Sequence, residues 1–298
     1  MIVITTPTGK IGSRVLEIVV AQQDKTGELV RVIVRDPSGL PDAIRDRVEV
    51  VAGSHGDREV LDRAFVGADA VFWLVPSDHR APSLEAMYSG FTRPAAEAFA
   101  AHGVGHVVGV SALGRGTAAA GRAGHVTASL AMDDLIASTG VAYRALANPT
   151  FMDNLLRQVN SIREQGVFTD TIDPGQRLPI APTRDIGAVG ARLLLDRSWT
   201  GTGEVPVLGA ADLSPNDMAH TMSEVLGRRI RYVHQSFEQF RDSLTGYGLP
   251  APIVRGYLEM MRAVSEGINE GVPRTPENTT PTTFREWCEQ VLAPAVRV

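Results

Sequence analysis

The chain has 298 residues, of which 44% are hydrophobic and 21% are charged. These proportions are ordinary for a soluble globular protein with one large domain, or with a main domain and a smaller companion. The net charge of −5 provides no general attraction for nucleic acid, and the single cysteine, Cys288, excludes an internal disulfide framework. No membrane-length apolar run and no basic leader is found, so we expect a cytoplasmic protein without membrane contact.

Residues 1–12 predict a strand, a turn and the start of a helix. Ile2, Val3 and Ile4 form an apolar run typical of a strand buried on both faces, and an apolar helical pattern begins at Ile11. Glycines at positions 9 and 12 would let the backbone approach a pyrophosphate and let the helix pack on the strand. The free N–H groups at the start of the helix favour phosphate, so this stretch is interpreted as part of a dinucleotide-binding unit.

Position 6 departs from the usual glycine pattern, because Thr6 is followed by Pro7. A β-branched residue resists positive φ, and the residue before a proline is pushed toward extended conformations. We therefore expect Thr6 to have negative φ. The turn would then be wider than in an intact motif and would bind pyrophosphate less tightly.

Strands and helices alternate through the first half of the chain. The apolar patterns predict strands at 29–34, 48–52, 70–75, 106–110 and 141–146 and helices at 57–65, 92–102 and 126–138. This alternation predicts a doubly wound parallel Rossmann sheet over residues 1–150, with right-handed crossovers. The later patterns are less regular, with helices expected at 151–165 and 185–195 and a short strand at 205–208. We expect residues 151–298 to form a smaller C-terminal α/β substrate lobe, packed as one unit with the first.

The end of the second predicted strand bears on cofactor choice. Arg35 stands there and Asp36 follows, where an acidic residue favours NAD and an arginine accommodates the 2′-phosphate of NADP. Because the guanidinium comes first and suits phosphate, NADP(H) is favoured over NAD(H). The alternative is that Arg35 is a solvated charge at a strand end.

Other chemistry is less well supported by the sequence. Only Lys10 and Lys25 are lysines, and no tyrosine has a lysine four residues later, so the Tyr-x-x-x-Lys pair of standard short-chain dehydrogenases is absent. The histidines show no zinc-ligand spacing, so no metal site is predicted. His79, just after the fourth strand, and His125 could donate a proton in a cleft, although solvated loop or cap positions are the favoured interpretation. His79 is retained as a possible substrate contact.

Several motifs in order resemble the NmrA-like family of atypical short-chain dehydrogenase/reductases, in its triphenylmethane-reductase and quinone-reductase branch. The motifs are Thr8-Gly9-Lys10-Ile11-Gly12, Val34-Arg35-Asp36, Ala64 to Phe72, Leu74-Val75-Pro76, Thr139 to Tyr143, Phe151 to Leu156 and Arg184-Asp185-Ile186. The resemblance covers nearly the whole chain. It implies a Rossmann sheet that binds NADP(H) across its switch point, and a small-molecule substrate for a monomer or homodimer.

The resemblance also implies roles for particular residues. The implied cofactor contacts are Thr6, Thr8, Gly9, Lys10, Ile11 and Gly12 at the pyrophosphate, Arg35 at the 2′-phosphate, Trp73, Leu74 and Val75 at the adenosine and ribose, and Ser111, Phe151, Met152, Asp153 and Asn154 at the nicotinamide. Phe151 is also a possible substrate contact. Catalytic candidates are Ser111, Ser129 and Asp133. Reductase members usually carry a lysine or histidine where this chain has Ser129, four residues before the acidic Asp133.

Three functions follow from these expectations. The first is NADPH-dependent reduction of a small apolar, aromatic or quinone-like substrate by direct hydride transfer. The second is a non-catalytic NADP(H)-binding sensor that reports redox state to a protein partner. The third is a biosynthetic enzyme that kept the fold but not the hydride chemistry. Thr6 and Ser129 favour the second function, whereas the complete second lobe favours the first.

Overall fold

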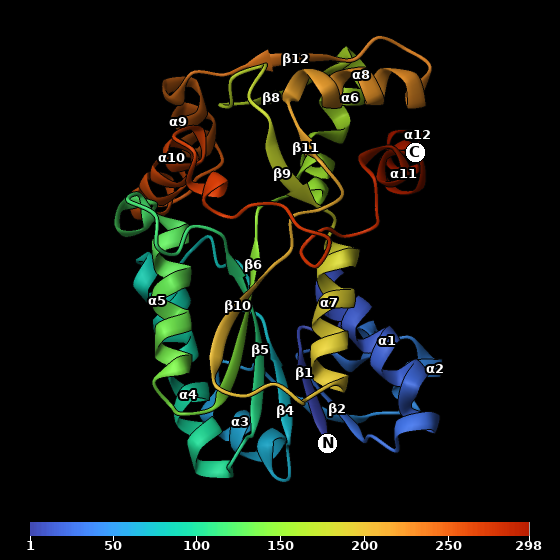
Figure 1. The fold of residues 1–298 in the computed structure, drawn as a ribbon, viewed down its shortest axis with the longest axis vertical. Coiled ribbons are helices and arrows are strands. Elements are labelled where there is room, and N and C mark those ends of the chain that lie inside the picture. The colour runs from blue at the N-terminus through green and yellow to red at the C-terminus, as the bar shows by residue number, and fades with distance from the viewer. Residues whose placement is uncertain (298) are drawn as a thin grey trace.

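Seven parallel strands form the central sheet in the computed structural model, which describes residues 1–297 (Figure 1). The strands are β1 (Ile2–Thr5), β2 (Val30–Val34), β3 (Glu49–Ala52), β4 (Ala70–Trp73), β5 (His106–Ala112), β6 (Ala142–Asn148) and β10 (Thr202–Pro206). Their order across the sheet is β10-β6-β5-β4-β1-β2-β3, and every neighbouring pair is parallel. The chain runs outward from β1 to β3 and then crosses to β4 on the other side of β1. The predicted doubly wound Rossmann sheet is confirmed, with its switch point between β1 and β4.

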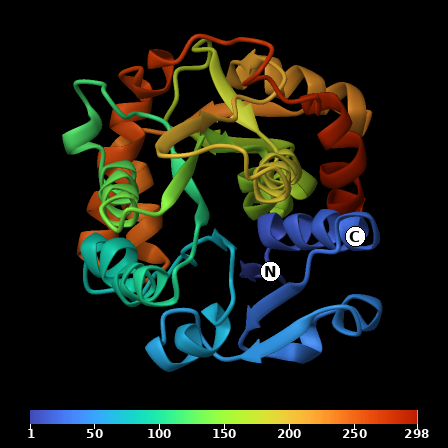
Figure 2. The same ribbon diagram turned by 60° about the horizontal axis from the view of Figure 1, so that its bottom comes forward.

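Helices cover both faces of this sheet. In Figures 1 and 2, α1 and α7 lie together on one face, and α3, α4 and α5 cover the other. Their bounds are α1 (Lys10–Thr26), α3 (Arg58–Phe65), α4 (Phe91–His102), α5 (His125–Ala137) and α7 (Thr183–Leu195), with the short α2 (Asp42–Arg45) beyond β2. Because the strands are enclosed on both sides, their side chains form continuous apolar runs: Ile2, Val3 and Ile4 are fully buried.

The remaining elements form a lobe above the carboxyl ends of the strands, at the top of Figure 1. They include a three-stranded sheet, a two-stranded sheet and several helices. Their bounds are β7 (Thr150–Phe151), α6 (Val159–Gln165), β8 (Val167–Asp170), β9 (Leu178–Ala181), β11 (Asp212–Leu213), α8 (Pro215–Leu226), β12 (Arg231–His234), α9 (Phe237–Gly246), α10 (Ala251–Ser265), α11 (Phe284–Trp287) and α12 (Ala293–Arg297). No helix within residues 1–297 is long and apolar enough to cross a membrane.

Two elements from beyond residue 150 belong to the layers of the large sheet. The helix α7 packs on α1, and β10 pairs with β6 from Tyr143 to Ala147 as the edge strand. The expected strand at 205–208 therefore begins earlier and lies in the main sheet, not in the second lobe. The division of the chain at residue 150 stays a prediction, and these two elements pack across it.

Two other elements differ from expectation. Residues 151–165 are not one helix, because Phe151 ends the short strand β7 and a 3₁₀ segment from Met152 to Gln158 precedes α6. The strand β4 ends at Trp73 and not at Val75. Thr5 explains this early end, since its hydroxyl donates to the Phe72 carbonyl (2.9 Å) and accepts from the Leu74 amide (3.1 Å). The Thr5 side chain thus takes the place of backbone hydrogen bonds between β1 and β4, and the chain after Trp73 leaves the sheet at the switch point.

Candidate functional site

A cleft of about 940 Å³ lies across the carboxyl ends of the strands, where open α/β sheets bind ligands. Its wall begins at the turn between β1 and α1, passes the ends of β2, β3 and β4, and continues to the ends of β5 and β6. The start of α5 and residues of the second lobe, among them Met260, Val264 and Asn269, complete the wall. The cleft is therefore shared by the two parts of the molecule and spans the switch point.

The turn at the start of the cleft contains the one non-glycine residue with positive φ in the described chain, Thr6 at φ 51°. The expectation of negative φ is wrong. The Thr6 carbonyl accepts a hydrogen bond from the Gly9 amide (3.0 Å), and a Cβ added at Gly12 would lie 2.1 Å from the Thr6 carbonyl oxygen. Closing β1 tightly onto α1 thus requires the left-handed conformation at position 6, and this requirement outweighs the local preferences of threonine and of the following Pro7. The turn is not widened.

This turn fits a pyrophosphate. Thr6 lines the cleft. Its hydroxyl oxygen is buried and has no hydrogen-bond partner within residues 1–297. The helix α1 begins without a side-chain cap, so its first amides are free. Thr8, Gly9, Lys10 and Ile11 also line the cleft, whereas Gly12 lies behind it and permits the close approach of helix and turn.

Arg35 occupies the expected place at the end of β2. Its side chain is exposed, lines the cleft and forms no ion pair with the part of the chain that the structure describes. The neighbouring Asp36 is used locally, because its carboxylate accepts from the Ser38 amide (2.9 Å). Hydrogen bonding by the Ser38 side chain and, second, by its amide lowers the pKa of Asp36. The guanidinium is therefore available to a phosphate, while the Asp36 carboxylate is engaged outside the cleft.

His55 is a cleft residue that sequence reasoning missed. It follows β3, lies edge-on to Trp73 and Phe91, and its Nε2 is 3.0 Å from the Leu74 carbonyl. Burial lowers its pKa to about 4, and the positive charge of Arg35 adds to this effect. The ring is thus neutral near pH 7. A polar residue directly after a parallel strand was the signal available in the sequence.

The three residues expected at the adenosine divide into two groups. Leu74 and Val75 line the cleft, as the early end of β4 allows. Trp73 does not line it, because its side chain is fully buried in the core between the sheet and the helices α3 and α4. The indole Nε1 donates to the Thr92 hydroxyl (3.1 Å), so Trp73 is a core residue in this structure.

The residues expected at the nicotinamide also divide. Ser111, Phe151 and Asn154 line the cleft. Met152 is buried in the core of the second lobe, and the Asp153 carboxylate accepts from the Thr183 amide (3.0 Å) at the start of α7. Asp153 also lies 3.5 Å from the Lys10 ammonium, so it connects the glycine turn to α7 from outside the cleft.

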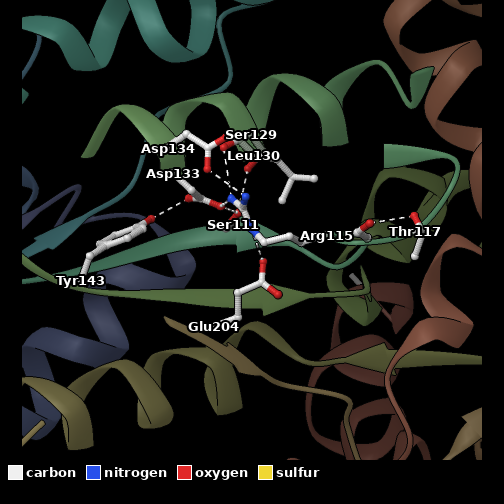
Figure 3. Close-up of polar contacts among 10 residues, drawn as sticks. Ser111, Arg115, Thr117, Ser129, Leu130, Asp133, Asp134, Tyr143 and Glu204 are labelled. Carbon is white, nitrogen blue, oxygen red and sulfur yellow. Dashed lines mark hydrogen bonds and ion pairs between the residues drawn. The ribbon is translucent and has the colours of Figure 1, made fainter. Parts of the chain in front are cut away.

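The three catalytic candidates are brought together in a buried hydrogen-bonded group (Figure 3). The Ser111 hydroxyl contacts the Ser129 hydroxyl at 3.2 Å and hydrogen-bonds to the Asp133 carboxylate, which also accepts from the Tyr143 hydroxyl at 2.6 Å. Ser111 and Ser129 line the cleft, and Asp133 lies behind them. The adjacent Asp134 is exposed and pairs with Arg115 (2.8 Å).

Burial raises the pKa of Asp133 to about 6, against the lowering effects of Ser111, Tyr143 and Arg115, whose guanidinium lies 3.7 Å away. A carboxyl group behind a cleft with such a pKa is typical of functional sites. Sequence reasoning did not connect Tyr143 and Arg115 with Asp133, because these residues meet only through the packing of β6 and the segment after β5 on α5.

Of the two histidines considered as proton donors, His79 is the solvated loop residue that was favoured, whereas His125 is buried. His125 is neither a solvated loop residue nor an exposed cap: it is 6% exposed at the start of α5 and lines the cleft. Its Nδ1 is 3.2 Å from the Tyr88 hydroxyl, and burial lowers its pKa to about 4. His79 is exposed on the loop after β4 and does not line the cleft.

Asn148 is a second residue that the sequence did not single out. It is buried at the end of β6 and lines the cleft. Its side-chain amide donates to the Ser111 carbonyl (3.0 Å) and to the Leu146 carbonyl (2.7 Å). These bonds fix the backbone of Ser111 and hence the place where its hydroxyl enters the cleft.

Comparison with known proteins agrees with this geometry. Residues 7–177 match the sequence model of a family described as NAD(P)H-binding. The chain is 30% identical, over 96% of its length and 96% of the relative's, to a (4-alkanoyl-5-oxo-2,5-dihydrofuran-3-yl)methyl phosphate reductase from Streptomyces griseus. It is 27% identical to an NAD(P)H azoreductase from Xenophilus azovorans, over 99% and 98% of the two chains.

A solved structure supports the fold. The triphenylmethane reductase of a Citrobacter species, in complex with NADP(H), superimposes with a TM-score of 0.77 at 18% identity, and the match covers 99% of each chain. At this identity the likeness concerns the fold. It extends over both the central sheet and the second lobe.

Proposed function

Because this chain belongs to the NAD(P)H-binding family, as its resemblance to NmrA-like reductases predicted, we propose that it is an NADPH-dependent reductase of small apolar electrophiles. One observation carries the proposal. A single cleft leads from a tight glycine turn, past the Ser111 hydroxyl, to a chamber lined by apolar side chains of α5 and α10. Such a cleft can hold a dinucleotide and place a small acceptor beside its reactive end.

The cofactor would be held by groups that face the cleft. Thr6 and the first amides of α1 would bind the pyrophosphate, and Arg35 the 2′-phosphate. Leu74 and Val75 would pack on the adenosine ribose, and Phe151 and Asn154 on the nicotinamide side. When bound, NADPH supplies the hydride. The Arg35 guanidinium supports NADPH over NADH, because no carboxylate within residues 1–297 pairs with it.

The acceptor end of the cleft supports the substrate class. Its walls include the apolar or aromatic side chains of Met87, Tyr88, Val126, Met260 and Val264. These side chains would exclude water and hold a flat apolar molecule. The names of the relatives describe an alkanoyl-substituted oxo-dihydrofuran that carries a methyl phosphate, an azo group and a triphenylmethane. The conjugated, electron-poor part is common to all three, and a quinone would share it.

Ser111 and Ser129 are two hydroxyl groups that this wall offers near the expected nicotinamide position. Both are neutral hydroxyls, and no lysine stands at position 129 to bond the nicotinamide ribose as a cation. We therefore expect turnover to be slow and to favour acceptors that are already electrophilic.

Titration of NADPH fluorescence, followed by turnover with a benzoquinone, an azo dye and a triphenylmethane dye, tests the proposal. NADPH binding with oxidation by at least one acceptor is the expected result. Tight NADPH binding with no turnover of any acceptor would favour the redox sensor that acts through a protein partner. Absence of NADPH binding would contradict the proposal as a whole.

A further inference from the structure

Reduction of a quinone, an azo group or an activated double bond needs a proton as well as a hydride, yet the chain lacks the Tyr-x-x-x-Lys pair. We propose that Asp133 is a buried proton reservoir, and that the Ser111 hydroxyl carries its proton into the cleft. This inference rests on the proposed reductase function. It assigns the source of the proton to a carboxyl group that has no direct access to substrate.

Ser111 lies between the cleft and the buried carboxylate of Asp133. Ser111 lines the cleft, and its hydroxyl hydrogen-bonds to the carboxylate of Asp133, whose side chain is only 3% exposed (Figure 3). The Ser129 hydroxyl, 3.2 Å from that of Ser111, borders the same point of the cleft. A proton can therefore pass between Asp133 and the cleft through one hydroxyl, without opening the core.

The fold makes room for this group at a specific glycine. A Cβ added at Gly109 of β5 would lie 2.3 Å from the Tyr143 hydroxyl and 2.9 Å from its ring. The bare backbone of Gly109 therefore lets the Tyr143 side chain cross β5 from β6 and reach Asp133 on α5. The Tyr143 hydroxyl is a donor to Asp133 in both protonation states, because burial and the neighbouring Asp133 raise its own pKa well above the usual value.

The charges around Asp133 keep both of its forms accessible. Burial raises its pKa, as does Glu204 on β10, whereas Ser111, Tyr143 and Arg115 lower it, with a balance at about 6. Near pH 7 about one tenth of the carboxyl groups would then be protonated. A proton donor is most effective when its pKa lies near the working pH.

The state of Asp133 sets the direction of the Ser111 hydrogen bond. An ionised carboxylate only accepts, so Ser111 donates to it and offers lone pairs to the cleft. A protonated Asp133 donates its proton to the Ser111 oxygen, which frees the Ser111 proton for the cleft. After hydride addition, the negatively charged oxygen, nitrogen or carbon of the acceptor would take the proton of Ser111. Ser111 would take that of Asp133, whose new carboxylate is stabilised by Tyr143 and Arg115. After product release, a proton from solvent in the cleft passes to Ser111, and the Ser111 proton passes back to Asp133, which restores the protonated carboxyl group.

Two acceptors with different proton needs separate this relay from the reductase function. An azo dye needs a proton after hydride addition, whereas a triphenylmethane cation becomes neutral by taking the hydride alone. Asp133→Asn should lower the ratio of azo to triphenylmethane turnover by about 100-fold, the effect of losing a general acid. Asp24→Asn, at an exposed carboxylate of α1 that does not line the cleft, is the matched control and should change this ratio less than twofold.

A second variant gives a readout that structural damage would not produce. In the wild type, azo turnover should fall as the pH rises through about 6. Tyr143→Phe removes a hydrogen bond to the ionised carboxylate and should raise this midpoint by about one pH unit. The variant should therefore be faster than the wild type at pH 7. The infrared band of the protonated Asp133 carboxyl, followed without NADPH, should show the same two midpoints.

The outcomes are distinct. If the wild type reduces none of the acceptors, the reductase function fails and the relay fails with it. If it reduces them but Asp133→Asn leaves the ratio unchanged, the relay alone is overturned. An infrared midpoint below pH 4 in the wild type would also overturn it, because Asp133 would then hold no proton to deliver.

Discussion

Replacement of Thr6 by glycine should stabilise the protein, which is unusual for removal of a side chain beside a ligand-binding cleft. Thr6 is a β-branched residue at φ 51°, and such left-handed positions store roughly 1–3 kcal/mol of strain. Its buried hydroxyl has no hydrogen-bond partner among the described residues 1–297, which costs about 1–3 kcal/mol more. Against this stand the greater backbone entropy of glycine, about 0.5–1 kcal/mol, and about 1 kcal/mol for lost methyl burial. The middle of these ranges gives a net gain of about 2 kcal/mol.

Thermal and urea unfolding without nucleotide measure this gain, because bound NADPH would itself raise the Tm. One kcal/mol corresponds to a rise of about 2 °C or more in a chain of this size. Thr8→Gly is the matched control: Thr8 is exposed and has no positive φ, so it should lose about 0.5–1 kcal/mol. Thr6→Ala, which removes the hydroxyl but keeps a Cβ, should lie between wild type and Thr6→Gly. A Thr6→Gly protein no more stable than wild type would refute the strain argument.

Three further results follow from the site. Gly12→Ala should abolish measurable NADPH binding and lower stability by more than about 2 kcal/mol, since its Cβ would meet the Thr6 carbonyl. Gly121→Ala, whose Cβ would meet nothing within 4 Å, should do neither. Arg35→Ala should weaken NADPH binding 10- to 100-fold, about 1.5–3 kcal/mol, and leave NADH binding nearly unchanged; equal losses would contradict the 2′-phosphate assignment. The pKa of His55, lowered from 6.5 to about 4, means that the unfolded chain binds more protons between these values. Stability should then fall by roughly 3 kcal/mol as the pH decreases through that range, and His55→Gln should remove this part of the fall in urea titrations.

Much of the first half of the chain could be predicted because its signals are local. Continuous apolar runs marked the buried strands, and the glycines at positions 9 and 12 marked a turn onto a helix. Arg35 could be placed at the cleft because strand ends share one edge of a parallel sheet. For these features, the side chain and its immediate neighbours in sequence carry the information.

The predictions that failed depended on contacts between distant segments. Local preferences gave Thr6 a negative φ, but the packing of α1 against β1 imposes a positive one. Trp73 ends a strand that points toward the cofactor site, yet its side chain lies in the core, and the next residues, Leu74 and Val75, line the cleft.

The chain by itself determined the alternation of strands and helices, the glycine turn and the family resemblance, because each rests on residues a few positions apart. Only the tertiary structure decided which polar groups share the cleft wall. Asp133 lies on α5. Ser111 on β5 is 22 residues away from it in sequence, and Tyr143 on β6 is 10 residues away. Their meeting depends on the register of two strands and on the missing side chain at Gly109. Burial then raises the pKa of Asp133, and burial depends on the packing of the whole molecule around it.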